Sequence, residues 1–333
     1  MRRHCFTFPV IAAVAAYALF TSGCTPTYPK EELPSAVQTV FKEEYNMDVE
    51  VTVLGSTIGI YYPMEGLLDV GLGISEESWD TISNLVLVAS RVVLSTDADI
   101  KFYCVIAQDA RLPELQVVII KYVEDVKRSM YRNISRGESF KRTLFSVNLT
   151  PQAKKERSVN KVFEKLGVEE PTRQKIMDEF FRSPPTKLSD IGYWRDQFYI
   201  KDITLEEFLA AQIASRIKLE FKGEEKLEQA FDFKSAEAEY TKGPQHNKFD
   251  LKFKINEQKA STEIENLKRK KIQEILKIIN RVVYGYKFKD FDAVVMEDQM
   301  ENVTLSVSMQ NVYEFTRENL PVEEIVHTSK PYF

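Results

Sequence analysis

The chain has 333 residues, enough for two domains of ordinary size that each bury a core. Hydrophobic residues make up 44% of it, with 21 Phe and 15 Tyr, so the composition is that of a folded globular protein and excludes an intrinsically disordered one. The formal net charge of −5 gives no electrostatic reason to expect nucleic-acid binding.

The first 24 residues indicate where the protein is located. Arg2 and Arg3 give a positive start, residues 6–20 are mainly apolar, and small residues precede Cys24 in Thr21-Ser22-Gly23-Cys24. This stretch resembles the signal peptide of bacterial lipoproteins, although Thr21 stands where that family usually has Leu. The resemblance implies that residues 1–23 are removed, that the sulfur of Cys24 carries lipid, and that residues 24–32 form a tether.

The same resemblance implies a bacterial cell-envelope protein that is held at a membrane, with the periplasmic side of the outer membrane as the expected location. Two or more acyl chains anchor a protein stably. An ordinary secretory leader and a retained membrane helix are the alternatives. The helix is disfavoured because the apolar run, 6–20, is shorter than the roughly 20 residues that a bilayer requires, and Pro9 interrupts it.

The cysteines agree with this reading. Cys5 belongs to the leader and Cys24 takes the lipid, which leaves Cys104 alone in the mature chain. No disulfide is then expected within one chain, so packing must supply the stability. Cys104 lies in an apolar run, where a buried and inert thiol is expected.

Residues 33–148 are predicted to form a first α+β module. Helices are predicted where apolar residues recur every three or four positions, and strands where they alternate. Ser75, followed by two acidic residues, is typical of a helix start. The predicted order is a helix from 33 to 45, strands at 49–53 and 58–62, a helix at 75–94, strands at 100–107 and 115–121, and a helix at 123–131.

Residues 149–203 differ in character and are predicted to be a helical connector packed on one or both modules. One helix is expected at 159–166 and a second after Pro171. An aromatic cluster follows, and its members Tyr193, Trp194 and Tyr199 are the first candidates for a surface that binds a partner.

Residues 204–320 are predicted to form a second module, followed by a C-terminal tail at 321–333. A helix is expected at 205–217, strands at 231–240 and 249–255, a long helix at 262–283, and strands at 291–297 and 303–309.

The second half of each module repeats. Ile82, Leu85 and Val88 align with Ile272, Ile275 and Ile278, and the triplet Arg91-Val92-Val93 aligns with Arg281-Val282-Val283. Each module therefore follows the order helix-strand-strand-helix-strand-strand. This order predicts an α+β fold with two related modules, each a four-stranded, largely antiparallel sheet with helices on one face. The order of the strands is not readable.

Histidine, metal and catalytic signatures are weak. Only His246 and His327 remain after the leader, and neither lies in a recognisable motif. Acidic residues flank the repeated strands, namely Asp97, Asp99 and Asp109 in one copy and Asp290, Asp292 and Asp298 in the other. They are interpreted as turn residues that accept from nearby backbone amides, with cation binding or acid-base work as the alternative. No catalytic residue, metal ligand or cofactor is predicted.

Two further sets of charged residues are of interest. Arg91 and Arg281 recur in register and are predicted to be solvated near helix C-termini, or alternatively to pair with an acid of the adjoining strand. Residues 121–142 carry seven basic and three acidic residues. This stretch is interpreted as a solvated helix, and contact with anionic headgroups or an acidic partner is the alternative. Its candidate surface residues are Lys127, Arg128, Arg132 and Arg136.

The function predicted from the sequence is a non-catalytic binding or assembly role in the envelope. The expected partners are the membrane and an envelope protein, not nucleic acid. Paired α+β modules behind a lipid anchor are similar to accessory lipoproteins of outer-membrane assembly machines, at the level of fold only. A carrier of an apolar ligand between sheet and helices and an envelope hydrolase that uses carboxylates are the alternatives.

Overall fold

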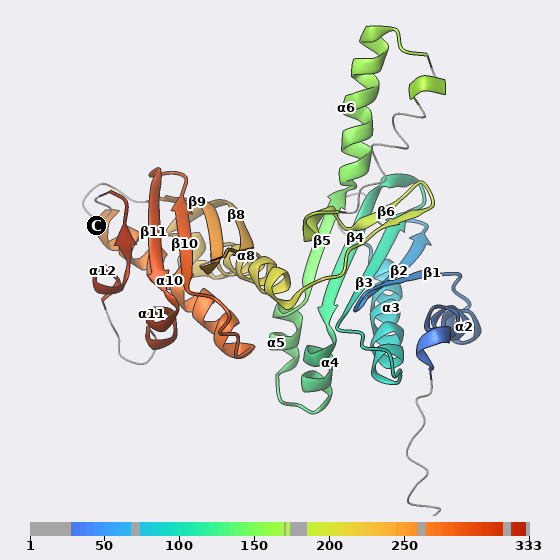
Figure 1. Ribbon diagram of the computed structural model, residues 1–333, viewed down its shortest axis with the longest axis horizontal. Helices are drawn as coiled ribbons and strands as arrows, with labels where there is room; N and C mark the ends of the chain where they lie inside the picture. Colours follow the sequence, from blue (N-terminus) through green and yellow to red (C-terminus); the bar gives the residue numbers. More distant parts are fainter. Residues whose placement is uncertain are drawn as a thin grey trace, which may run out of the picture.

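The computed structural model describes residues 28–67, 74–169, 171–173, 185–244, 246–258, 264–315 and 321–330. Two modules lie side by side, and helix α6 projects from the body beside the first of them (Figure 1). The predicted signal peptide, Cys24 and the first part of the predicted tether, residues 24–27, lie outside the described residues. So does most of the second connector helix that is predicted after Pro171.

Module 1 is a five-stranded sheet with helices on one face. Its strands lie in the order β1-β2-β3-β4-β5, with β2 and β3 parallel and the other pairs antiparallel. Its elements are η1 (Lys30–Glu32), α2 (Leu33–Tyr45), β1 (Glu50–Leu54), β2 (Thr57–Met64), α3 (Glu76–Leu94), β3 (Phe102–Asp109), β4 (Leu112–Tyr122), α4 (Val123–Met130), α5 (Arg136–Lys141) and β5 (Leu144–Leu149).

Module 2 repeats this plan, and its five strands are again in chain order, with β9 and β10 as the parallel pair. Its elements are α8 (Leu205–Gly223), α9 (Glu225–Glu228), β8 (Phe231–Lys242), β9 (Asn247–Glu257), α10 (Ile264–Gly285), β10 (Ala293–Asp298), β11 (Val303–Ser308), α11 (Met309–Glu314), α12 (Val322–Ile325) and β12 (His327–Thr328).

The predicted α+β fold with two related modules is confirmed, and each contains the predicted order helix-strand-strand-helix-strand-strand, with the short helices η1 and α9 as additions. The sheets have five strands where four were predicted. Strands β5 and β12 are the additions, because residues 144–149 and 327–328 were not assigned to strands. The parallel pair in each sheet follows from the connection, since a helix that crosses between neighbouring strands returns the chain in the same direction.

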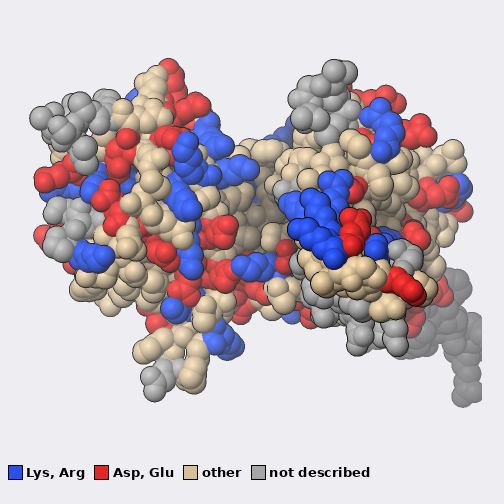
Figure 2. Space-filling model, turned by 90° about the horizontal axis from the view of Figure 1, so that it is seen from above, with Lys and Arg blue, Asp and Glu red and all other residues tan. Residues whose placement is uncertain are grey.

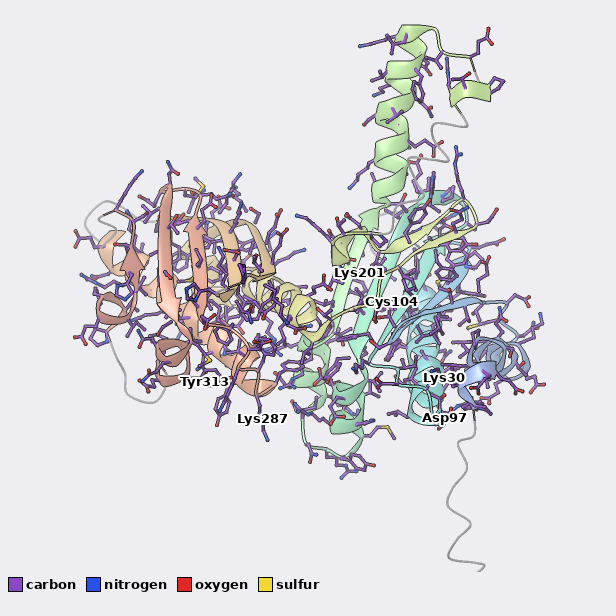
Figure 3. The ribbon with its side chains drawn as sticks, viewed as in Figure 1. Lys30, Asp97, Cys104, Lys201, Lys287 and Tyr313 are labelled. Atoms are coloured by element: carbon purple, nitrogen blue, oxygen red, sulfur yellow. The ribbon has the colours of Figure 1, made fainter. Side chains whose placement is uncertain are left out.

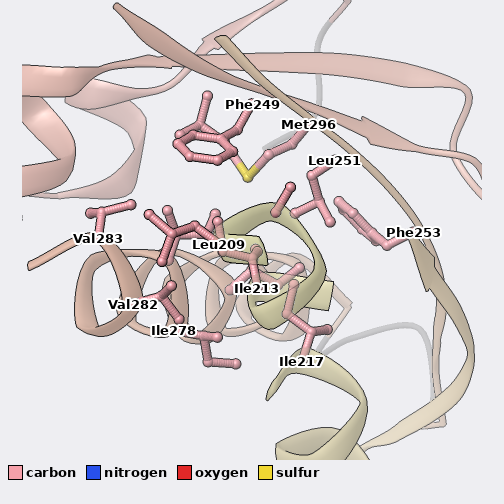
Figure 4. Close-up of a cluster of buried hydrophobic side chains, with 14 of the residues drawn as sticks. Leu209, Ile213, Ile217, Phe249, Leu251, Phe253, Ile278, Val282, Val283 and Met296 are labelled. Atoms are coloured by element: carbon pink, nitrogen blue, oxygen red, sulfur yellow. The ribbon is translucent and has the colours of Figure 1, made fainter. Parts of the chain in front are cut away.

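The repeated apolar positions form the helix-facing cores. Ile82, Leu85 and Val88 of α3 are buried against sheet 1, and Ile272, Ile275 and Ile278 of α10 are buried against sheet 2. Figure 4 shows how this looks in module 2, where α8, α10, β9 and β10 contribute one packed cluster. Its labelled members are Leu209, Ile213, Ile217, Phe249, Leu251, Phe253, Ile278, Val282, Val283 and Met296.

The connector is only partly helical, which corrects the prediction. It contains α6 (Pro151–Leu166), η2 (Leu188–Asp190) and a hairpin of β6 (Gly192–Trp194) and β7 (Gln197–Tyr199). Alternation of apolar residues in the aromatic cluster favours a strand, because every second side chain can face the same sheet. The hairpin covers the face of sheet 1 that the helices leave open (Figure 1).

Polar contacts attach the connector to module 1. The side-chain amide of Gln116 accepts from the backbone N of Tyr193 at 3.0 Å and donates to its carbonyl oxygen. A carboxylate oxygen of Asp202 accepts from the backbone N and the hydroxyl of Ser56, each at 2.8 Å. Apolar packing continues across the same region, because one cluster of buried apolar residues extends from sheet 1 through the connector to α8 and sheet 2. The two modules share a core.

Candidate interaction surfaces

The aromatic cluster that was predicted to bind a partner is largely buried. Tyr193 is 3% exposed and Tyr199 is 6% exposed. The ring of Tyr193 stacks on Tyr61 with centroids 3.6 Å apart, and its hydroxyl donates to Glu50 at 2.6 Å. The prediction is wrong for both tyrosines, because the hairpin turns them onto sheet 1 and into the connector.

Trp194 is half-buried and contacts helix α6. Its indole N donates to Glu156 of α6 at 3.0 Å, and it packs beside Phe163 and Tyr199. These contacts attach α6 to the connector hairpin, so the aromatic cluster positions the projecting helix. Two apolar side chains of α6 are exposed, Val162 at 52% and Leu166 at 70%.

The predicted basic surface lies on α4, α5 and the turn between them. Lys127, Arg132 and Arg136 are exposed. Arg128 is half-buried and its guanidinium donates to the carbonyl oxygen of Gly285 in module 2 at 2.9 Å, so it belongs to the contact between modules. Lys141 is exposed as well. We call residues 127–141 the basic tip.

A group of buried charged residues, which sequence reasoning missed, joins the two modules next to the basic tip. Asp125 of α4 is 1% exposed and its carboxylate pairs with Arg142 at 2.8 Å. Its second oxygen accepts a hydrogen bond from the hydroxyl of Tyr286, which follows α10. The Arg142 guanidinium also lies over the Tyr286 ring, 4.7 Å from its centroid.

Glu138 completes this interface cluster. One of its carboxylate oxygens accepts from Arg142 at 2.8 Å and from Arg216 of α8 at 2.7 Å. Partial burial alone raises the pKa of Glu138, but the hydrogen bonds from Arg216 and Arg142 outweigh it and hold that pKa below its usual range. Burial and the nearby Asp125 carboxylate raise the pKa of Tyr286, so its hydroxyl stays protonated and donates. Helices α4 and α5 of module 1, with Arg142 directly after α5, are thus held to α8 and to the residue after α10 in module 2.

Among the repeated acids, Asp109 and Asp298 behave as the sequence predicted, whereas Asp97 and Asp292 accept from backbone amides of distant segments. Asp109 accepts from the backbone N of Arg111 at 2.8 Å, and Asp298 accepts from that of Met300 at 3.0 Å. Both carboxylates therefore hold the hairpin turn that follows the first strand of the repeat. Asp298 also pairs with the buried Lys271 at 2.7 Å.

The repeated arginines form equivalent ion pairs. Arg91 of α3 contacts Glu44 of α2, and Arg281 of α10 contacts Glu220 of α8, each at 2.6 Å. The acid comes from the neighbouring helix, so the hypothesis of pairing with the adjoining strand is wrong. Both arginine side chains remain more than a third exposed, as expected for solvated positions.

An apolar strip on module 1 is partly exposed. Phe145, Val147 and Leu149 of β5 lie on the sheet face that α2 and α3 cover elsewhere, because they pair in register with Ile119, Val117 and Leu115 of β4. Their exposures are 37%, 39% and 40%. Trp79 of α3 is 39% exposed and stacks on Phe145, with ring centroids 5.4 Å apart. We call these four residues the apolar strip.

Comparisons of the chain with models of protein families, with curated proteins and with solved structures each give no match. Within the described parts of the chain, no cluster of three or more His, Cys, Asp or Glu side chains could hold a metal ion. Nor does any helix among those residues have the length and apolarity needed to cross a membrane. Cys104 lies in sheet 1 (Figure 3), and burial raises the pKa of its thiol to about 12.

Proposed function

We propose that this protein is a lipid-anchored, non-catalytic protein of the bacterial cell envelope that binds another envelope protein. The apolar strip is the observation that carries the binding role. Its four side chains are adjacent, and each leaves more than a third of its surface in water in a chain that otherwise buries nearly all of the same sheet face. The free energy gained by burying apolar surface, about 25 cal/mol per Å², favours covering it with a partner.

An apolar surface of another protein suits the strip better than a charged one. The strip consists of two aromatic and two aliphatic side chains on a rigid sheet and helix. Aromatic anchors on a preformed support lose little conformational entropy when they bind. The sequence-level resemblance at Cys24 adds a membrane anchor, which restricts the search for that partner to a surface.

The two other functions receive less support. A carrier needs room between sheet and helices, and that layer is occupied in both modules by continuous clusters of fully buried side chains. A carboxylate hydrolase needs converging acids. Asp109 and Asp298 hold turns, and Asp125 and Glu138 pair with arginines.

A photo-crosslinking amino acid in place of Phe145 tests the binding role in intact bacterial envelopes. The same group in place of Lys254, an exposed residue of β9, is the control. We expect one protein adduct from position 145 that is absent from position 254, and that is lost when Val147 and Leu149 are changed to Ser. Equal labelling at both positions, or no protein adduct at 145, would refute the proposed binding role of the apolar strip. Mass spectrometry of the N-terminal peptide tests for lipid on Cys24.

A further inference from the structure

The basic tip combines positive charge with the most exposed large apolar side chains of module 1. Residues 127–141 contain five basic residues, Lys127, Arg128, Arg132, Arg136 and Lys141, and one acidic residue, Glu138. That acid is occupied by Arg142 and Arg216, and Glu124, just before the tip, pairs with Lys127 and Arg128. Among the described residues, no ion pair is formed by Arg132, Arg136 or Lys141.

Three apolar side chains stand between these charges. Met130 is 67% exposed, Tyr131 is 76% exposed and Phe140 is 64% exposed. Such exposure of a methionine, a tyrosine and a phenylalanine on one short segment is unfavourable in water alone. Basic residues interleaved with Met, Tyr and Phe are typical of segments that lie at the boundary between headgroups and acyl chains.

The tip is held rigidly, so its apolar side chains cannot turn inward. Val123 and Val126 fix the inner side of α4 in the core of module 1. Ser135 begins α5 and its hydroxyl accepts from the backbone N of Glu138 at 3.1 Å. The interface cluster then holds Asp125 and Arg142 on either side of the tip. The tip is therefore presented to its surroundings by the packing of both modules.

The chain enters module 1 at the same end. The backbone N of Tyr28 donates to the carbonyl oxygen of Ser95 at 3.2 Å, and that of Lys30 donates to Asp97 at 2.7 Å. These contacts fix the start of the described chain beside the C-terminal end of α3. In Figures 1 and 3, this start, with Lys30 and Asp97, and the turn between α4 and α5 lie at the lower end of module 1, and α6 projects from the opposite end.

We propose that the basic tip docks on the surface of an anionic phospholipid bilayer, with Met130, Tyr131 and Phe140 entering the headgroup region. The inference deepens the proposed function, because a lipid on Cys24 would bring the tip to the bilayer. Docking would fix the orientation of the body, with α6 directed away from the membrane.

A bilayer fits the tip better than an acidic protein does. The charges and the apolar side chains are interleaved on one convex end, whereas a protein interface concentrates apolar residues at its centre and charges at its rim. Seen from the end from which α6 projects, basic and acidic side chains are interspersed over both modules (Figure 2). Each basic residue near an anionic surface strengthens binding by about fivefold, since it contributes about 1 kcal/mol.

The test uses the full chain reconstituted in lipid nanodiscs, with a photo-crosslinking amino acid in place of Tyr131. The same group in place of Met300, which is 46% exposed in the β10–β11 turn of module 2, is the control. Discs of purely zwitterionic lipid are compared with discs containing a third of anionic lipid. We expect a phospholipid adduct at position 131 in the anionic discs, several-fold less in zwitterionic discs, and background at position 300.

A triple variant then tests the electrostatics. Arg132→Glu, Arg136→Glu and Lys141→Glu together should reduce the adduct at position 131 to background, since three contributions of about fivefold are removed. The variant should fold, because all three side chains are exposed and surface substitutions of this kind change stability little. Lys234→Glu, Lys252→Glu and Lys254→Glu on the outer face of sheet 2 change the net charge equally and should leave the adduct intact.

The outcomes distinguish docking by the basic tip from attachment by the lipid anchor. A chain that co-elutes with the discs but gives no lipid adduct at position 131, or an adduct that survives the triple variant, overturns docking by the tip and leaves the anchor standing. A chain that co-elutes only with anionic discs, and is labelled there at position 131, supports the tip while the proposed lipid anchor fails. A protein adduct at 131 in envelopes, with none to lipid, would assign the tip to an acidic partner instead.

Discussion

The interface cluster makes a prediction about how the two modules unfold. Tyr286→Phe removes the hydroxyl that donates to the buried Asp125 carboxylate and leaves the ring in place. The ring contacts with Tyr122 and Phe208, at centroid separations of 6.1 and 6.3 Å, remain available to phenylalanine. The substitution therefore isolates one hydrogen bond between module 1 and module 2.

The expected cost follows from the burial of the acceptor. Asp125 keeps its contact with Arg142 but loses the partner of its second oxygen, in a site where its side chain is 2% exposed. A hydrogen bond to a charged group contributes about 1.5–3 kcal/mol, and a buried acceptor without water cannot recover it. We expect the free energy of unfolding of the full chain to fall by that amount.

Guanidinium unfolding provides the measurement, because the chain has two tryptophans, Trp79 and Trp194, which lie in module 1 and the connector. Their fluorescence reports on module 1, whereas circular dichroism reports on the whole chain. Since the two modules share a core, the substitution in module 2 should shift both signals together. Tyr284→Phe, two residues earlier and 53% exposed, is the matched control and should change the free energy by less than about 0.5 kcal/mol. An unchanged fluorescence transition in Tyr286→Phe, or equal effects of the two substitutions, would refute the reasoning.

Three further predictions concern side-chain packing and ion pairs between the modules and within them. Gly285→Ala places a Cβ 2.8 Å from a guanidinium nitrogen of the interface cluster and should destabilise the chain by about 1–3 kcal/mol in the same assay, whereas Gly223→Ala, where a Cβ meets nothing within 4 Å, should not. Arg91→Ala and Arg281→Ala should each cost less than about 1 kcal/mol, because both arginine side chains are more than a third exposed to water; a larger loss would mean that they fix helix packing. The folded pKa of Glu138 lies below its unfolded value, so its contribution is complete above about pH 4.3 and is lost as the pH falls through the folded pKa. Glu138→Gln should therefore flatten the acid side of the stability profile, and an unchanged profile would contradict this.

The repeated part of the fold could be predicted because periodicity alone fixes it. Helix α3 and the strands after it have the apolar spacing that packing on one sheet face requires, and α10 repeats that spacing position by position. The turn acids could be predicted for the same reason. Asp109 and Asp298 are the last residues of their strands, and a carboxylate at that place reaches the backbone amides two and three residues on.

The aromatic hairpin and the interface cluster could not be predicted, because each depends on residues far apart in the chain. Tyr193 is buried only because Gln116 and Glu50, which precede it by 77 and 143 residues, lie where the connector returns across sheet 1. A short run of apolar and aromatic residues has the same sequence pattern whether it forms a binding surface or packs against a sheet. The burial of Asp125 likewise requires Tyr286, which is 161 residues away, and no spacing in the sequence indicates that pairing.

The two copies of the repeat differ on the face that the helices do not cover, and this difference explains why the modules form one body. In β3 the outward positions are Phe102, Cys104 and Ile106, which are buried under the connector and α8. In module 2 the corresponding outward positions of β10 include Ala293 and Val295, which are half-buried, and the neighbouring strands present charged and polar side chains there. A sheet with two apolar faces needs a second cover, and the connector supplies it together with the start of α8. Module 1 therefore depends on the chain that leads to module 2, so the apolar strip and the basic tip are presented by a single folding unit.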